Sequence, residues 1–325
     1  MDIFSPLQKF ADIVTFQWFG ITEQSYLSGV VNFWIYDVLK ISLLLIVINY
    51  FMAITRYYFP MEKVRDLLTK KNWHGTQYLL AAILGVITPF CSCSSIPLFM
   101  GFLSAGIPLG VTFAFLISSP LVNESSLFLF PSVFGIKITL LYNILGIAIA
   151  VIGGFLIQKL KLEKYVQPDI LAFAGKKQLL KKYEGQYIPW KERFKLWTNE
   201  MWDITKNIYP YVLLGVTLGA LIHGLVPESL ISSALNGSSL WSVPIAVVLG
   251  VPLYANSVSV IPIIEALISK GVPIGTALAF MTATVTLSIP EALMLKKILK
   301  WQLMAVFFGI TTIGIILIGY LFNSY

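Results

Sequence analysis

Residues 88–97 read Thr88-Pro-Phe-Cys-Ser-Cys-Ser-Ser-Ile-Pro97, a polar stretch that holds both cysteines of the chain. Apolar runs lie on both sides of it, Tyr78 to Ile87 before and Leu98 to Leu103 after. Each run is shorter than the roughly 20 residues that cross a bilayer as a helix. Backbone without helical hydrogen bonds is tolerated at membrane depth only where protein or a water-filled cavity surrounds it. We therefore expect a broken helical pair whose break lines a cavity.

The composition indicates the class of protein. Hydrophobic residues make up 57% of the chain and charged residues only 12%, and the mean hydropathy is +0.80. The long apolar runs are continuous rather than alternating with polar residues, which favours membrane-spanning helices over a strand barrel. The net charge of +7 arises from basic residues in loops beside apolar runs, as the positive-inside rule expects. The sequence thus predicts an all-α, polytopic transmembrane protein whose partner is the lipid bilayer, with no nucleic-acid partner.

The cysteine count and the motifs exclude several kinds of site. Two cysteines in a C-x-C spacing provide neither a disulfide framework nor a four-cysteine zinc site. A Gly-rich phosphate loop followed by Lys and Ser or Thr is also absent from the sequence. No removable signal peptide is recognisable at the N-terminus. We expect no cofactor, no metal and no enzymatic activity.

The sequence repeats itself at a separation of 165 residues. Leu84-Gly85-Val86 returns as Leu249-Gly250-Val251, and the signature Gly-x-Pro-x-Gly occurs at Gly106 to Gly110 and again at Gly271 to Gly275. This regularity predicts an internal duplication. The expected units are an N-terminal interfacial segment (1–32), a first transmembrane repeat (33–158), a basic cytoplasmic linker (159–202) and a second transmembrane repeat (203–325).

Charge predicts how the two repeats are oriented. Most lysines and arginines fall in the segments 56–71, 159–195 and 296–300, which we expect on the cytoplasmic side. The cysteine-containing pair then enters from the cytoplasm, and its equivalent around Asn256 enters from outside. Inverted repeats with discontinuous helices are typical of secondary transporters. Whether each short pair is re-entrant or crosses fully stays open. The expected spans and half-spans are 33–55, 78–89, 96–103, 111–130, 138–157, 204–225, 243–253, 258–268, 274–289 and 303–322.

Three motifs carry a family resemblance. Thr88-Pro-Phe-Cys-Ser-Cys-Ser94, the signature at Gly106 to Gly110, and Phe115-Leu-Ile-Ser-Ser-Pro120 resemble the predicted-permease family that includes the ArsP organoarsenical efflux permeases and the YraQ-type permeases. The resemblance implies a multi-pass permease of the inner, cytoplasmic membrane that contributes to arsenical resistance. It also implies that Cys91 and Cys93 match cysteines that recognise trivalent organoarsenicals.

The thiol pair suits a soft substrate. Thiolates select thiophilic centres over hard cations, and two sulfurs suit a monosubstituted trivalent arsenical with two exchangeable positions. In a helix Cys91 and Cys93 would lie about 200° apart, so we expect both in an unwound segment, with a helix beginning near Ser95 or Ile96. Further binding groups are expected at Ser92, Ser94 and Ser95, and in the other repeat at Asn256, Ser257 and Ser259.

Polar and acidic residues elsewhere in the apolar runs are further candidates. The segment Ser118-Ser-Pro120 predicts a second break, so that Ser119, Asn123 and Glu124 would face the same cavity. Ionisable groups inside a membrane are costly and usually functional, which makes Glu124 and Glu291 candidates for proton coupling. For Glu291 the alternative is a position at the cytoplasmic surface, and for Glu265 an outer-surface pair with Lys270.

We expect a secondary-active permease for a small thiophilic solute, with efflux of trivalent organoarsenicals as the leading function. One alternative is a permease for a sulfur-containing or other small anion, bound by serines and helix N-termini. Another is a membrane thiol oxidoreductase that uses the C-x-C as a redox pair, which is weaker because the chain has no second cysteine pair. The sequence is compatible with a homo-oligomer.

Overall fold

The computed structural model describes residues 5–21, 26–58, 68, 75–88, 92–167, 189–225, 241–253 and 257–324. Within these residues every regular element is a helix, apart from an isolated antiparallel bridge between Val166 and Leu299. The elements of the first half are α1 (Ser5–Asp12), a π-helix η1 (Ile13–Trp18), α2 (Tyr26–Tyr58), α4 (Thr76–Ile87), α5 (Ser92–Ser104), α6 (Leu109–Leu121), α7 (Glu124–Phe128), α8 (Phe130–Val133), α9 (Ile136–Lys159) and a 3-10 helix η2 (Leu162–Tyr165). Those of the second half are α12 (Trp190–Leu225), α14 (Ser242–Gly250), α15 (Ser257–Ser269), α16 (Ile274–Thr286), α17 (Ile289–Leu295) and α18 (Trp301–Ser324).

The longer helices have the length and the outer surface of membrane spans. Among the described residues, four segments are long and apolar enough to cross a bilayer: Ser28–Phe51, Ile136–Lys159, Ile274–Leu295 and Trp301–Ser324. Ile144 and Ile152 on α9, and Ile313 and Leu317 on α18, are more than half exposed. Their spacing of four or eight residues places each pair on one helical face, which suits contact with lipid tails. These helices confirm the prediction of a polytopic, helical membrane protein.

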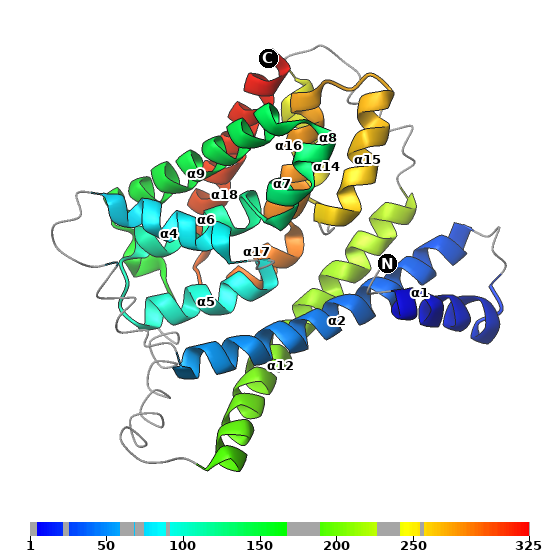
Figure 1. Ribbon diagram of the computed structural model, residues 1–325, viewed down its shortest axis with the longest axis horizontal. Coiled ribbons are helices and arrows are strands. Elements are labelled where there is room, and N and C mark those ends of the chain that lie inside the picture. The colour runs from blue at the N-terminus through cyan, green and yellow to red at the C-terminus, as the bar shows by residue number, and fades with distance from the viewer. Residues whose placement is uncertain are drawn as a thin grey trace.

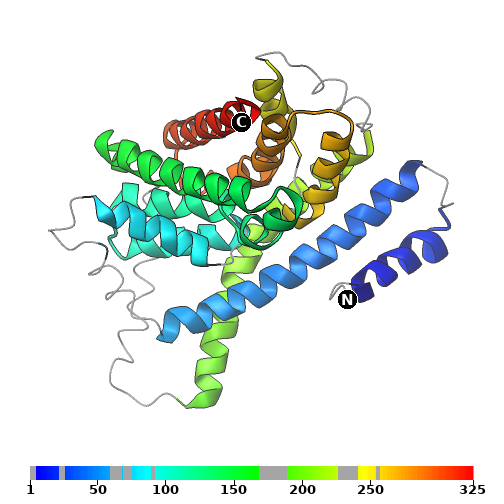
Figure 2. The same ribbon diagram turned by 45° about the horizontal axis from the view of Figure 1, so that its top comes forward.

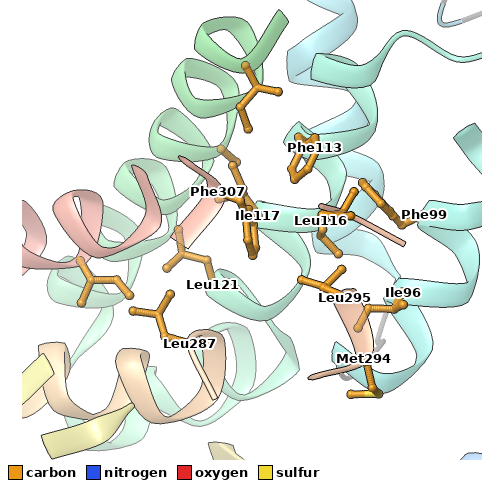
Figure 3. Packing of buried hydrophobic residues seen from close by; sticks show 14 of the residues in the cluster. Ile96, Phe99, Phe113, Leu116, Ile117, Leu121, Leu287, Met294, Leu295 and Phe307 are labelled. Carbon is orange, nitrogen blue, oxygen red and sulfur yellow. The ribbon is translucent and has the colours of Figure 1, made fainter. Parts of the chain in front are cut away.

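Two helices form the centre of the bundle. Every residue of α6 is buried, and so are most residues of α16. In Figure 1, α4, α5 and α9 pack around α6, while α14, α15 and α18 pack around α16. The halves meet through apolar side chains: the rings of Phe113 and Phe307 have centroids 5.6 Å apart, and Figure 3 shows Ile117 beside Phe307. The interior is therefore a shared core, to which both halves contribute.

Helix bounds in the two halves correspond at the separation found in the sequence. α5, α6 and α9 begin and end 165 residues before α15, α16 and α18. The turns before α6 and α16 also correspond, because Gly106 and Gly271 have positive φ angles of 79° and 91°. Glycine adopts such angles without the steric cost that a side chain brings. The first glycine of each Gly-x-Pro-x-Gly signature thus makes the same turn.

The second glycine of each signature permits close helix packing. Gly110 of α6 lies against Gly154 of α9, and Gly275 of α16 lies against Gly319 of α18. Side chains from the outer helices bond the first-turn amides beside these contacts. The Gly110 amide donates to Oε1 of Gln158 at 2.8 Å, and the Thr276 amide donates to Oδ1 of Asn323 at 3.0 Å. Small residues allow helix backbones to approach in this way within membranes.

The two longest helices, α2 and α12, pair with each other along one side of the bundle (Figures 1 and 2). Asn49 Nδ2 donates to Thr205 Oγ1 at 3.1 Å, and Trp34 Nε1 donates to Thr217 Oγ1 at 2.9 Å. Residue numbers therefore decrease along α2 where they increase along α12. The pair is antiparallel, and interhelical hydrogen bonds hold it together.

The long apolar helices α9 and α18 also cross in opposite directions. A Cβ built on Gly314 would lie 2.6 Å from Cγ2 of Ile149, and one built on Gly153 would lie 3.1 Å from Cγ2 of Ile310. Ile149 and Gly314 occupy equivalent positions, because 165 residues separate them. Equivalent helices of the two halves thus touch at equivalent points while running antiparallel.

Several predicted bounds differ from the structure. The expected span 111–130 stops being helical at Leu121, and Val122 is extended, with φ −122° and ψ 91°. The expected span 274–289 is likewise divided between α16 and α17. Both interruptions are too short to disturb an apolar pattern, which is why hydropathy alone did not reveal their positions.

The ends of the predicted units also differ. α2 begins at Tyr26, inside the expected interfacial segment, and α12 begins at Trp190, inside the expected linker. The preceding helix α1 folds back on α2, because Asp12 Oδ1 accepts hydrogen bonds from Gln8 Nε2 at 2.9 Å and from Asn32 Nδ2 at 2.8 Å. At these points the long helices extend beyond their apolar parts. Composition indicates which residues lie in the membrane, not where a helix begins.

Candidate functional site

The C-x-C motif lies at the start of α5. Helix α4 ends at Ile87 and α5 begins at Ser92, so Cys93 belongs to the first helical turn. The prediction of a helix start near Ser95 or Ile96, with both cysteines unwound, is therefore wrong for Cys93. The reason is that Pro97 lies inside the helix and does not begin it.

Pro97 has a chemical consequence for the motif. Proline has no N–H, so it cannot donate a helical hydrogen bond to the carbonyl four residues earlier, which belongs to Cys93. The carbonyl of Cys93 is thus left out of the helical hydrogen-bond ladder. Cys91 and Asn256 lie outside the described residues, as do the side chains of Ser92, Cys93 and Ser94.

The beginnings of α5 and α15 are equivalent. Ser257 and Ser259 lie in the first turn of α15, 165 residues after Ser92 and Ser94, and their side chains are also outside the described part of the chain. In each half, a helix thus begins within the polar segment in which binding residues are predicted. The binding roles of these residues stay predictions.

Helix α17 of the second half packs against α5. Figure 3 shows Ile96 of α5 beside Leu295 and Met294 of α17, and all three are buried in one cluster. Glu291 is one turn before Leu295 and therefore lies near the same face of α17. The structure thus brings α17, which carries Glu291, against α5, which begins at Ser92, although the two helices are far apart in the sequence.

Glu291 is completely buried, with an exposed fraction of 0%. The alternative that it reaches the cytoplasmic surface is therefore wrong. A charged carboxylate in such a place has to be paired or protonated, because burial without compensation costs far more than folding provides. Glu265 of α15, by contrast, is exposed.

The break expected at Ser118-Ser-Pro120 is wrong in position, because these residues are helical in α6 and the interruption follows Leu121, between α6 and α7. Asn123 Nδ2 donates to the carbonyl of Pro120 at 3.3 Å, and Asn123 Oδ1 accepts from the amide of Ser126 at 3.1 Å. Asn123 thus closes the junction and caps α7. Ser95 and Ser119 are buried in α5 and α6, and the side chain of Glu124 lies outside the described residues.

Sequence reasoning missed Tyr142, which joins the two halves. Its buried hydroxyl lies 3.1 Å from the carbonyl of Leu121, at the end of α6, and 3.0 Å from Thr282 Oγ1 of α16. The carbonyls of the last helical turn have no partner within the helix, so a side chain has to supply one. A signal was present, since Tyr142 and Asn143 are adjacent polar residues within an otherwise apolar run.

Replacing Tyr142 with phenylalanine is expected to destabilise the protein by about 1–3 kcal/mol, because the Leu121 carbonyl would remain buried without its donor. The ring contacts with Phe130 would be kept. The midpoint of thermal unfolding of the purified protein in detergent measures the effect. An unchanged midpoint would contradict the bridging role of the hydroxyl.

Asp37 is a second polar residue that the sequence analysis did not single out. It lies in α2 within a segment that is long and apolar enough to cross a membrane, one turn before Lys40. The Lys40 ammonium lies 5.2 Å from the ring centre of Tyr36, which favours a cation electrostatically. An acid within the predicted span 33–55 was the available signal.

Several known proteins resemble the chain, two of them over about three quarters of its length. It is 23% identical to the UPF0718 protein MJ0584 of Methanocaldococcus jannaschii, over 75% of this chain and 81% of that protein. It is also 23% identical to the UPF0718 protein YraQ of Escherichia coli, over 73% of this chain and 64% of that protein. The UPF0718 protein YcgR of Bacillus subtilis is 28% identical over 36% of this chain and 40% of its own length. No solved structure matches the chain.

The family described as predicted permease, ArsP_1, matches residues 26–324, from the start of α2 to the end of α18. This match covers both halves and every helix that contributes to the candidate site. It confirms the resemblance that the C-x-C and Gly-x-Pro-x-Gly motifs indicate. The chain therefore belongs to the ArsP_1 family of predicted permeases.

Proposed function

We propose that this permease is a secondary-active transporter that exports trivalent organoarsenicals, binding them at the C-x-C segment. The observation that carries the proposal is the contact between α5, which begins at the motif, and α17, which carries the buried Glu291. The helix that begins within the motif and the helix that carries an ionisable group thus touch where the two halves meet. Coupling between a solute and an ion requires such proximity or a shared moving element.

The proposed chemistry uses both thiols. Cys91 and Cys93 each exchange a proton for one arsenic bond, so that two hydroxyl ligands of the arsenical leave as water and arsenic keeps its organic group. Arsenic is a soft centre that prefers sulfur to oxygen. The remaining groups of the site would be Ser92, Ser94 and Ser95 at the start of α5 and, from the other half, Asn256, Ser257 and Ser259. Ser119, Asn123 and Glu124 are proposed to line the same path.

We take the two halves to be inverted repeats. A twofold axis in the membrane plane relates each helix to an equivalent helix that runs in the opposite direction. The antiparallel pairs α2 with α12 and α9 with α18 support this arrangement. Motion of one half against the other would then expose a shared site to each side of the membrane in turn.

The basic segments support a common cytoplasmic side. The amide of Gln167 donates to the carbonyl of Ile298 at 2.9 Å, and the amide of Lys300 donates to the carbonyl of Tyr165 at 2.8 Å. Two of the three lysine-rich segments therefore meet at one end of the bundle. By the positive-inside rule, this end would face the cytoplasmic side of the cell membrane.

Uptake of methylarsenite into everted membrane vesicles tests the proposal. Replacing Cys91 or Cys93 with serine is expected to reduce uptake at least tenfold, because each substitution removes one of two arsenic ligands. Ser104→Ala, at the other end of α5, serves as a control and is expected to leave uptake unchanged. Unchanged uptake in both cysteine variants would rule out the thiol mechanism.

Transport of a small anion is the second candidate. The helices α5 and α15 both begin within the polar segments, and helix N-termini favour negative charge. In the same vesicles, inhibition of solute uptake by thiosulfate, without inhibition by arsenicals, would favour this candidate over the first.

A further inference from the structure

The two interhelical junctions of the halves differ in their polar contacts. The junction between α6 and α7 is closed by Asn123, which caps α7, and by Tyr142, whose hydroxyl bonds the end of α6. Adding 165 to these numbers gives Ser288 and Phe307 at the junction between α16 and α17. Phe307 has no hydroxyl to replace that of Tyr142. The second junction therefore lacks one of the groups that close the first.

The capping arrangement of α17 is also unformed. Ser288-Ile-Pro-Glu291 has the spacing of a capping box, in which the serine hydroxyl accepts a hydrogen bond from the N–H of the glutamate. Ser288 stands at the N-cap position but makes no side-chain cap bond. Its Oγ and the Oγ1 of Thr286 have no hydrogen-bond partner among the described residues. Both residues are completely buried.

Unsatisfied buried hydroxyls of this kind are rare and often mark a bound ion or water. Three features favour a cation at this junction. The buried carboxyl of Glu291 supplies negative charge, the two buried hydroxyls are hard oxygen ligands, and the partial negative charge at the carbonyl end of α16 offsets the partial positive charge at the start of α17. A single carboxylate balances a single positive charge.

We infer that the junction between α16 and α17 binds a sodium ion through Thr286, Ser288 and Glu291. The ion would be held at the start of α17, whose other end packs against Ile96 of α5 through Met294 and Leu295, so its arrival and departure would act on a helix that contacts the C-x-C helix. This inference deepens the proposed function, on which its coupling role rests, by naming the coupling ion. Sodium binding itself is measurable without any transported solute, so its failure is separate from failure of the arsenical proposal.

The test uses the full-length protein, purified in detergent, in NaCl, KCl or choline chloride at equal ionic strength. Binding to the folded state raises the unfolding midpoint, so sodium is expected to raise it by a few degrees in a saturable manner, and choline is not. Thr286→Val keeps the shape of the side chain and is expected to lose the sodium effect. In choline this variant is expected to unfold no earlier than the original protein, because valine removes a buried hydroxyl without a partner.

Matched variants separate a sodium ligand from a structural residue. Thr286→Ser keeps the hydroxyl and is expected to keep the sodium effect, whereas Ser288→Ala is expected to lose it. Ser126→Ala, at the first-half position equivalent to Glu291, is expected to keep it. Equal midpoints in NaCl and choline chloride for the original protein would overturn the inference, and so would a sodium effect that persists in Thr286→Val.

Discussion

Replacing Gly275 with alanine is expected to destabilise the protein by about 1–3 kcal/mol and to reduce the yield of folded protein, because the added methyl group overpacks the contact between α16 and α18. A Cβ at this position would overlap the carbonyl of Gly319 and lie 2.7 Å from the amide nitrogen of Asn323. Both neighbours are backbone groups, which cannot move without separating the helices. Thermal unfolding in detergent and size-exclusion chromatography measure the result.

Gly309 provides a matched control on α18. A Cβ built there meets nothing within 4 Å, so Gly309→Ala is expected to be neutral or stabilising by about 0.5–1 kcal/mol, the ordinary gain from replacing glycine within a helix. Gly110→Ala should behave like Gly275→Ala, since its Cβ would overlap the carbonyl of Gly154. Similar stabilities of the Gly275 and Gly309 variants would contradict the close-packing explanation of the signature.

The Gly-x-Pro-x-Gly signature illustrates what the sequence could predict. It located a repeated turn, because positive φ at Gly106 and Gly271 leaves few alternatives to glycine. The separation of 165 residues likewise anticipated matching helix bounds in the two halves. Local constraints of this kind depend on single residues and short spacings, so they can be found without knowledge of the fold.

Other features depend on partners far along the chain and could not be predicted in the same way. The bond from Tyr142 to the end of α6 requires knowledge of how α9 crosses α6. The burial of Glu291 depends on α17 being covered by α5 and α12, whereas its sequence neighbours allowed a surface position equally well.

The two halves differ in the candidate functional residues that they carry. The C-x-C motif belongs to the first half, and its counterpart at Asn256 to Val258 has no thiol. The acid at Glu291 belongs to the second half, where the first half has Ser126. Under the proposed function, the first half would carry the solute chemistry and the second half the ion chemistry. The contact between α5 and α17 joins the two.

Glu291→Gln is expected to abolish ion-driven accumulation of solute, with a loss of at least about a hundredfold, while solute exchange across the membrane continues. Glutamine has nearly the same shape and is neutral, so the variant can bury its side chain without the cost of burying a charge. It cannot, however, alternate between charged and neutralised states as an ion binds and leaves. Efflux coupling needs that alternation, whereas exchange of one solute molecule for another does not.

Proteoliposomes with an imposed sodium or pH gradient measure accumulation, and preloaded proteoliposomes without a gradient measure exchange. Glu265→Gln is the matched control, because Glu265 is an exposed acid on α15 and is expected to retain both activities. If Glu291→Gln lost exchange together with accumulation, Glu291 would be required for solute binding or folding rather than for coupling. If it retained gradient-driven accumulation, the buried carboxyl would have only a structural role, and the link from ion to solute through α17 and α5 would have to be abandoned.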